Sequence, residues 1–326
     1  MTNIKALITG ITGQDGYYLS NLLISKGYEV FGFGSSQNIA KASNLLREIP
    51  DVTLVNADLT NYESIESLIK YISPSEIYNL GGVSNIATSF ADPIHTANTV
   101  GLGLLRILEA CKHSSFKSSI KIFQASSSQI FAGTNTHVQN EQTEFNPIDP
   151  YGTAKVFAQN TAEMYRNLYG VFVSSAISYN HESPRRSTEY VSRKISKAIA
   201  RIKLGIDSSI VLGNVNSRRD WGYAPDYVEA MWKMLQIDTP DDYILSTGIS
   251  HSIMDWIEIA LRILDLTGPA ERYLQIDENN FRPTEPKVLV GDSSKAKEKL
   301  GWEPKTSFEK MVRIILEKDL EIESQK

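Results

Sequence analysis

The stretch that decides the fold lies at the start of the chain, where residues 5–25 read KALITGITGQDGYYLSNLLIS. A short apolar run, Lys5–Thr9, leads into three glycines with the spacing G-x-x-G-x-x-G, and apolar residues at helical spacing follow them. Glycines at such a turn let the backbone approach a pyrophosphate, and the N-terminus of the next helix favours an anion. The stretch therefore predicts a strand, a phosphate-binding turn and a helix, as in a dinucleotide-binding unit.

The same pattern of apolar runs and helical segments continues beyond this unit. Strands are predicted at Lys5–Thr9, Glu29–Phe33, Thr53–Asn56, Glu76–Asn79, Ile120–Ala125 and Val171–Ile177. Helices are predicted at Gly16–Lys26, Tyr62–Tyr71, Thr96–Lys112 and Thr153–Tyr169. Because right-handed crossovers join alternating strands and helices, we expect an α/β fold with a doubly wound parallel sheet of the Rossmann type.

The second half of the chain lacks this regular alternation of strands and helices. A basic amphipathic stretch, Tyr190–Leu204, precedes loop-rich sequence that ends in a charged helix, Ser307–Glu321. We place a dinucleotide-binding domain at residues 1–178 and a smaller lobe at residues 179–326. We expect that residues near 210–250 can return to the sheet of the first domain.

The composition is that of an ordinary soluble globular protein, with 41% hydrophobic and 22% charged residues among 326. A net charge of -5 gives no general attraction to nucleic acid or to an anionic membrane. No apolar run is long enough to span a bilayer, and the first residues have no signal-peptide pattern. The single Cys111, expected as a buried helix thiol, excludes an internal disulfide and a cysteine-based zinc cluster. We expect a cytoplasmic protein with no metal.

The choice between NAD and NADP depends on the end of the second strand, where an acid binds the ribose 2′-hydroxyl and an arginine binds a 2′-phosphate. Residues 32–36 read GFGSS and offer neither, so Ser35 is the expected contact. The missing arginine mildly favours NAD, while NADP stays open because serines also bind phosphate. Asp58 after the third strand fits a contact to the adenine edge.

A candidate proton-transfer pair lies farther along the chain. Tyr151 and Lys155 are four residues apart at the start of a predicted helix and share one face of it. A lysine cation beside a phenol is expected to lower the pKa of the tyrosine and make it a usable base. Ser127, in the serine-rich strand end ASSSQIF, could hold a sugar hydroxyl while hydride leaves for a nicotinamide.

Longer segments of the chain are similar to those of a known family, the GDP-mannose 4,6-dehydratases, which are extended short-chain dehydrogenases/reductases. They read ALITGITGQDGYYLSNLL, SEIYNLGG, NHESPRRSTEYVSRKI, RRDWGYAPDYVEAMW and FRPTEPKVLVGDSSKAKEKLGWEPKTSFEKMV. The resemblance implies a Rossmann domain with a smaller substrate lobe. It also implies a reaction that oxidises C4 of the sugar, eliminates water across C5 and C6, and returns hydride to C6.

The resemblance implies roles for individual residues as well. The cofactor is expected to be NAD or NADP and to be tightly bound. The residues expected around it are Gly10, Thr12, Gly13, Gln14, Asp15, Gly16, Ser35, Asp58, Leu59, Leu80, Gly81, Tyr151, Lys155, His181 and Arg186. Those implied around the GDP-sugar are Ser84, Asn85, Ser127, Ser128, Asn180, Val191, Lys194, Arg219, Arg282 and Glu285. The catalytic group is expected to comprise Ser127, Gln129, Tyr151 and Lys155.

The chain departs from the family's pattern at three places. The family's Thr-Ser-Glu triplet is Ser127-Ser128-Gln129, so an amide replaces the carboxylate that removes the C5 proton. Ser35 and Ser36 replace paired arginines that contact NADP and a neighbouring subunit, which leaves open whether the expected homo-oligomer is a dimer or a tetramer. Residues 82–86 read GVSNI in place of an AQSHV-like segment near the sugar.

These departures favour an enzyme that oxidises C4 of a GDP-mannose-like hexose or heptose and dehydrates it little or not at all. The alternative is a true 4,6-dehydratase in which a water or Glu141 replaces the missing base. A non-catalytic NAD(P)-binding regulatory protein is a third hypothesis, which retention of Tyr151 and Lys155 disfavours.

Overall fold

The structure is a computed structural model that describes residues 4–34, 42–112, 120–277 and 288–326. Its centre is a seven-stranded sheet with the order β10-β6-β5-β4-β1-β2-β3, in which every neighbouring pair is parallel. The strands are β1 (Lys5–Thr9), β2 (Glu29–Gly34), β3 (Val52–Asn56), β4 (Glu76–Asn79), β5 (Lys121–Ala125), β6 (Phe172–Ser178) and β10 (Asp242–Leu245). The predicted doubly wound parallel sheet is confirmed, and the six strands expected in the first half are all present.

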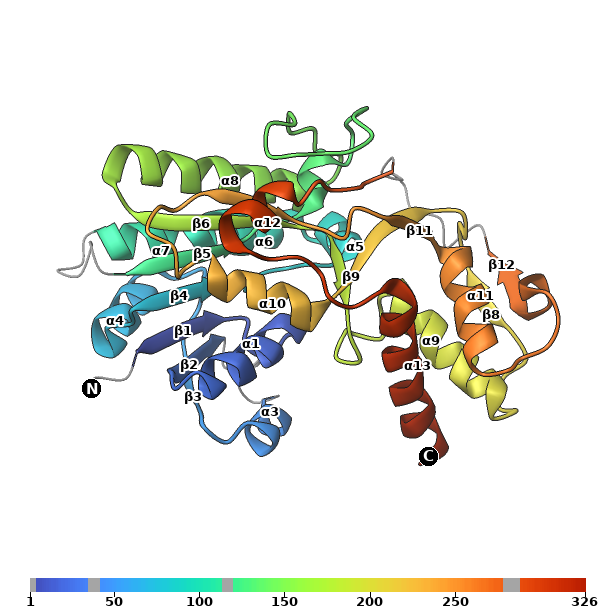
Figure 1. Cartoon of the computed structure of the whole chain (residues 1–326). Helices are drawn as coiled ribbons and strands as arrows, with labels where there is room; N and C mark the ends of the chain where they lie inside the picture. Colours follow the sequence, from blue (N-terminus) through green and yellow to red (C-terminus); the bar gives the residue numbers. More distant parts are fainter. Residues whose placement is uncertain (1–3, 35–41, 113–119, 278–287) are drawn as a thin grey trace.

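Helices cover both faces of this sheet (Figure 1). One face packs against α1 (Gln14–Ser25), α3 (Ser43–Glu48), α10 (Ala224–Lys233) and α12 (Ser294–Leu300). The other packs against α4 (Tyr62–Ile72), α7 (Leu102–Lys112) and α8 (Pro150–Tyr169). Both faces of the central strands are buried, and buried polar side chains such as Glu76 and Asn79 are hydrogen-bonded within this layer. Cys111 is a buried thiol on α7, as expected.

One predicted helix is not regular. The segment expected as a helix over residues 96–112 is divided into α6 (Pro93–Thr96), a π-helical turn η1 (Ala97–Gly101) and α7. Arg106 stabilises the wider turn, since its Nη1 donates to the Asn98 carbonyl oxygen at 3.0 Å. Such turns often mark functional sites, and Asn98 and Thr99 line a cavity described below.

Segments from the second half of the chain contribute to the sheet layer. Strand β10 pairs in parallel with β6, and α10 packs beside α1 in one hydrophobic core. The sheet layer therefore contains residues from both sides of residue 178.

The remaining elements form a smaller lobe with a core of its own (Figure 1). The helices are α9 (Val191–Lys203), α11 (Ile253–Ile263) and α13 (Phe308–Ser324), and the strands are β8 (Ile210–Leu212) paired with β12 (Leu274–Ile276). A three-stranded sheet of β7 (Asn180–Glu182), β9 (Arg218–Tyr223) and β11 (Ser250–Ser252) lies between the lobe and the large sheet. A buried ion pair fixes α9 to α13, because Arg193 Nε donates to Asp319 Oδ2 at 3.1 Å.

None of the helices that the structure describes is both long enough and apolar enough to cross a membrane.

Candidate active site

A cavity of about 810 Å³ opens at the carboxyl ends of the central strands. It lies at the switch point of the sheet, where β1 pairs with β2 on one side and β4 on the other. The predicted residues that line it are Gly10, Gly13, Gln14, Asp15, Gly16, Leu80, Gly81, Ser84, Asn85, Ser127, Ser128, Gln129, Tyr151, Lys155, Asn180, His181, Arg186, Val191, Lys194 and Arg219. A second cavity of about 540 Å³ shares Gly10 and Gly81 with the first and contains Thr12, Asp58 and Leu59.

The glycine turn forms a tight cradle between the two cavities. Gly10 has a φ of +66°, and a Cβ at this position would lie 2.9 Å from the Gly81 Cα. A Cβ on Gly16 would lie 2.5 Å from the Ile11 Cα, so α1 contacts the preceding turn directly. The N-terminal turn of α1 lines the larger cavity, which gives a phosphate both close backbone approach and unpaired N–H groups. This cradle fits a dinucleotide.

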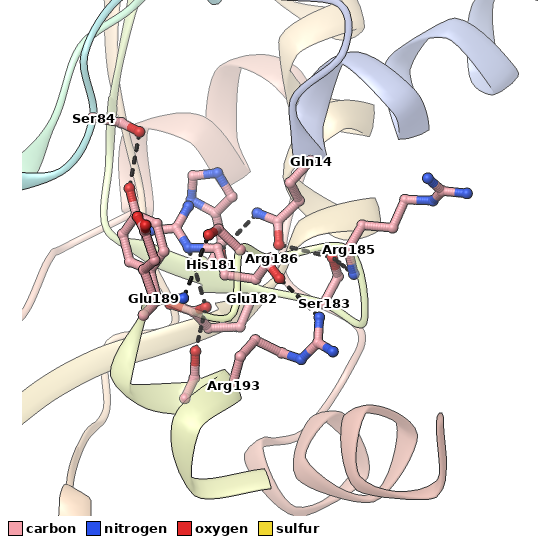
Figure 2. Close-up of polar contacts among 12 residues, drawn as sticks. Gln14, Ser84, His181, Glu182, Ser183, Arg185, Arg186, Glu189 and Arg193 are labelled. Carbon is pink, nitrogen blue, oxygen red and sulfur yellow. Dashed lines mark hydrogen bonds and ion pairs between the residues drawn. The ribbon is translucent and has the colours of Figure 1, made fainter. Parts of the chain in front are cut away.

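Gln14 has a structural contact that the sequence did not indicate. Its Nε2 donates to the His181 carbonyl oxygen at 2.9 Å, and its Oε1 accepts from Ser183 Oγ at 2.7 Å (Figure 2). The amide expected at the pyrophosphate thus also ties the start of α1 to the segment after β7. Ser183 was not predicted, and its only sequence signal is its place in NHESPRRSTEYVSRKI.

A second contact between the same elements joins Asp15 and His181. Asp15 Oδ2 lies 2.9 Å from His181 Nε2, while His181 Nδ1 lies 2.8 Å from the Tyr179 carbonyl oxygen. Burial alone would raise the pKa of Asp15, but the charges of His181 and Arg186 and the hydrogen bonds with His181 and Gln14 together outweigh it and hold that pKa below its ordinary value. Burial likewise opposes a charged His181, yet Asp15 raises the pKa of the imidazole above its ordinary value. Each group therefore favours the charged form of the other.

The second cavity corresponds to the expected adenosine end. Asp58 lines it, although one carboxylate oxygen already accepts from the Thr60 N–H at 2.8 Å. Three lining residues were missed by sequence reasoning: His95, Asn98 and Thr99. Only the irregular helical turn, which the periodicity did not reveal, brings Asn98 and Thr99 there. Ser35 lies outside the described residues, so the expected serine contact stays a prediction.

The candidate reaction centre combines the end of β5 with the first turn of α8. Asp149 caps that helix by accepting from the Gly152 N–H at 2.7 Å, and Pro150 occupies its first turn. This start places Tyr151 in the cavity beside Ser127. Lys155, one turn later, donates from Nζ to the Ala125 carbonyl oxygen at 2.6 Å, which fixes the ammonium.

The electrostatics of Tyr151 differ from the sequence-based expectation. Burial raises the pKa of the Tyr151 phenol above its ordinary value, and a hydrogen bond with Ser127 and the charge of Arg186 only partly oppose this effect. Burial also lowers the pKa of Lys155 to about 8. The predicted lowering of the Tyr151 pKa by Lys155 is therefore wrong for the protein groups alone, since burial penalises the phenolate and the ammonium alike.

Gln129 lies in the same centre, on the 3₁₀ turn η2 (Ser128–Phe131) that follows Ser127. Its backbone N–H donates to Ser127 Oγ at 3.3 Å, so the serine hydroxyl and the amide belong to one turn. The side chain lines the cavity, is only 7% exposed, and has a buried Oε1 that accepts no hydrogen bond from the residues that the structure describes. An unpaired buried amide oxygen is costly, which points to a ligand partner.

The sugar and nucleotide contacts expected in the lobe lie around the same cavity. Asn180, Val191, Lys194 and Arg219 all line it, as do Ser84 and Asn85 on the loop after β4. Asn85 also caps the short helix α5 (Ile86–Ala91), because its Oδ1 accepts from the Thr88 N–H at 3.3 Å. Arg282 and Glu285 lie outside the described residues, so their roles stay predictions.

Tyr190 is a cavity residue that sequence reasoning missed. Its hydroxyl lies 2.9 Å from Ser84 Oγ, across the cavity, and its ring stacks on the Arg186 guanidinium at 3.7 Å. The available signal was its i,i+4 spacing from Arg186, but Tyr190 precedes a helix and the spacing alone could not show the contact.

Comparisons with known proteins identify the family of this chain. The family model described as GDP-mannose 4,6 dehydratase matches residues 7–315. GDP-mannose 4,6 dehydratase 2 of Arabidopsis thaliana is 43% identical over 327 residues, covering 97% of this chain and 87% of that protein. GDP-mannose 4,6 dehydratase of Homo sapiens is 39% identical over 340 residues, covering 97% of this chain and 91% of that protein.

Solved structures show the same fold at lower identity. The dTDP-glucose 4,6-dehydratase of Bacillus anthracis in complex with NAD has a TM-score of 0.83 at 19% identity, with 98% of each chain covered. RMD of Pseudomonas aeruginosa complexed with NADPH has a TM-score of 0.80 at 21% identity, covering 98% of this chain and all of that one. Together with the family match over almost the whole chain, the fold and the site lead to one conclusion: the chain belongs to the GDP-mannose 4,6-dehydratase family.

Proposed function

We propose that this protein is an NAD(P)-dependent oxidoreductase that converts a GDP-mannose-like sugar into its 4-keto form with little or no dehydration. The observation that carries the proposal is the amide of Gln129, which lines the cavity beside Ser127 and Tyr151. An amide cannot accept and relay the proton that elimination of water requires. The hydroxyl, phenol and ammonium needed for oxidation are all present.

The chemistry follows from the side chains in the cavity. Ser127 orients the C4 hydroxyl, and Tyr151 as phenolate takes its proton while the C4–H electron pair leaves as hydride. A bound nicotinamide would accept that hydride, and the positive charge of its oxidised ring would favour the phenolate form of Tyr151. Arg186, with its charge already acting to lower the pKa of Tyr151, supports the same ionised state.

A 4,6-dehydratase is the second candidate, because the relatives with 43% and 39% identity carry that name. It needs a replacement base. Glu141 is a poor one, since its Oε1 accepts from the Ile244 N–H at 2.8 Å and it is absent from the described cavity wall. Asp15 and Glu182 line the cavity but pair with His181 and Arg186.

Product analysis separates the two candidates. Purified protein is incubated with GDP-mannose and, in parallel, with a GDP-manno-heptose, and both product mass and cofactor absorbance are followed. The proposal predicts loss of two hydrogens from the sugar and net formation of reduced cofactor. Loss of one water without net cofactor reduction would establish the dehydratase and reject the proposal.

Finer expectations belong to the same proposal. They are a tightly bound cofactor with a mild preference for NAD, a homo-oligomer, and a cytoplasmic location. The glycine cradle supports nicotinamide dinucleotide binding in general. Mass spectrometry of the cofactor released on denaturation, and light scattering of the purified protein, test the first two.

A further inference from the structure

The loop after β4 and the segment before α9 meet across the cavity through two hydroxyl groups. Ser84 Oγ and Tyr190 OH lie 2.9 Å apart, although 106 residues separate them in the sequence. Both residues line the cavity, and Figure 2 shows Ser84 directed towards the group that contains Arg186 and Glu182. The pair forms a polar bridge from the wall of the large sheet to the wall of the lobe.

The Tyr190 ring is held firmly on the lobe side. Its face stacks on the Arg186 guanidinium at 3.7 Å, and Arg186 Nε lies 3.3 Å from Glu182 Oε2. Glu182 is itself buried and accepts from Ser192 Oγ at 2.7 Å (Figure 2). A cation stacked on an aromatic face stabilises the position of the ring, so the phenol is presented in a defined direction.

The place of Tyr190 along the cavity indicates which part of the substrate it meets. Val191 and Lys194, expected at the nucleotide part, follow it on α9. Tyr190 also lines the same cavity as Tyr151. A residue in this cavity that directly precedes those expected at the nucleotide is suited to meet the sugar of a GDP-sugar.

The bridge is suited to binding a hydroxyl rather than merely excluding it. A hydroxyl has one hydrogen to donate and two lone pairs, so a Ser–Tyr pair leaves unused capacity on both oxygens. The contact is also partly exposed to the cavity. A substrate hydroxyl can enter the bridge by donating to one oxygen and accepting from the other.

We propose that Tyr190 and Ser84 are specificity-determining residues that together bind one substrate hydroxyl close to C4. This inference rests on the proposed function, because it assumes a GDP-sugar in the cavity. The two eligible groups are the C3 hydroxyl and the hydroxyl carried by the arm on C5. The chain would thereby select sugars that keep this hydroxyl during C4 oxidation.

Equilibrium binding tests the inference without requiring turnover. Affinities for GDP and GDP-mannose are measured for the wild type, Tyr190→Phe, Ser84→Ala and the double variant. Each single variant is expected to lose about 3- to 10-fold in affinity for GDP-mannose, as for one neutral hydrogen bond, and nothing for GDP. The double variant is expected to lose less than the product of the two single losses, since both act on the same hydroxyl.

A matched control is Tyr62→Phe, which removes a phenol hydroxyl that contacts Glu66 on α4, away from the described cavity walls. It should leave both affinities unchanged. Steady-state kinetics add a second readout, in which Tyr190→Phe raises KM for GDP-mannose by the same factor and changes kcat less.

Deoxy analogues identify the hydroxyl. The inference requires that either 3-deoxy or 6-deoxy GDP-mannose bind the wild type and Tyr190→Phe equally. It is overturned if both analogues stay sensitive to the substitution, if GDP binding falls as much as GDP-mannose binding, or if neither variant changes affinity. A wild type that does not distinguish GDP-mannose from GDP would reject the proposed function as well. Discrimination between GDP-mannose and GDP that neither single substitution reduces rejects this inference alone.

Discussion

Asp15 and His181 lie 166 residues apart in the sequence, yet their side chains meet at 2.9 Å and join α1 to β7. Both side chains are mostly buried, with exposed fractions of 22% and 12%. Gln14 and Ser183 make a parallel contact beside them. The position of Arg186 and Tyr190 in the cavity therefore depends on the helix that begins the dinucleotide fold.

This ion pair predicts a specific dependence of stability on pH. The lowered pKa of Asp15 stabilises the fold above its ordinary value of 3.8, and this effect is lost as the pH falls. The raised pKa of His181 stabilises the fold below its ordinary value of 6.5, and this effect is lost as the pH rises through the folded pKa. Asp15→Asn should lower the free energy of unfolding by about 1.5–3 kcal/mol, most strongly between about pH 4 and 6.5.

Urea unfolding of both proteins across this pH range measures the difference. Asp51→Asn, at an exposed position, serves as the control for removing one carboxylate. A stability difference that is constant with pH would contradict the coupling of Asp15 and His181.

Replacing Gln129 by glutamate should give the protein a dehydration activity. Gln129→Glu restores a group that can accept a proton, in a cavity position where the native amide oxygen has no partner. We expect a product that has lost water to rise at least about tenfold, within the range for one added general base. Product mass spectrometry after incubation with GDP-mannose measures it. If Gln129→Glu and the wild type form the same fraction of dehydrated product, the Gln129 amide is not what limits dehydration.

Tyr151 predicts loss of the oxidation step. Tyr151→Phe removes the proton acceptor but keeps the ring in its buried position on α8. The rate of C4 oxidation should fall by about 10²- to 10⁴-fold, whereas cofactor content and unfolding temperature change little. Stopped-flow absorbance of reduced cofactor gives the rate. Retention of more than about a tenth of the rate would assign the proton transfer to another group.

Lys155 predicts a rise in stability at alkaline pH. Burial lowers its folded pKa from 10.5 to about 8, so between these values the unfolded chain holds a proton that the folded chain does not. The free energy of unfolding should therefore gain up to about 3 kcal/mol from this group across that interval. Lys155→Met should lack the gain and also lose activity. Denaturation of both proteins at several pH values tests this, and parallel stability curves would exclude a strongly lowered Lys155 pKa.

Replacing Gly16 by alanine should weaken cofactor binding, because the added methyl group would clash with the backbone of Ile11. Gly16→Ala places a methyl group 2.5 Å from the Ile11 Cα, which forces the first turn of α1 away from the glycine turn. We expect a loss of about 1–3 kcal/mol in unfolding free energy and of most bound cofactor. Gly103→Ala is the matched control, because a Cβ there would meet Leu59 at an ordinary 3.5 Å. Equal cofactor content in the two variants would contradict the close contact.

Local sequence was sufficient for the parallel sheet. Strand β1 is a short apolar run, and Gly10 has a backbone conformation that other residues rarely adopt. One helical turn brings Tyr151 and Lys155 together. These features depend on residues near in sequence, so spacing and residue type carry the information, whereas the close approach of Gly10 to Gly81 joins distant segments.

Tertiary structure decided what no local pattern could show. The strand β10 joins the sheet through pairing with a strand more than sixty residues earlier, and Tyr190 meets Ser84 only because the lobe folds back over the loop after β4. The raised pKa of Tyr151 likewise comes from burial by elements distant in sequence, which is why the local effect of Lys155 predicted the opposite direction. The sequence by itself determined six of the seven strands, the glycine turn and the candidate reacting side chains. Only tertiary packing decided their electrostatics and the polar bridge between Ser84 and Tyr190, because burial and contacts between distant segments exist only in the folded chain.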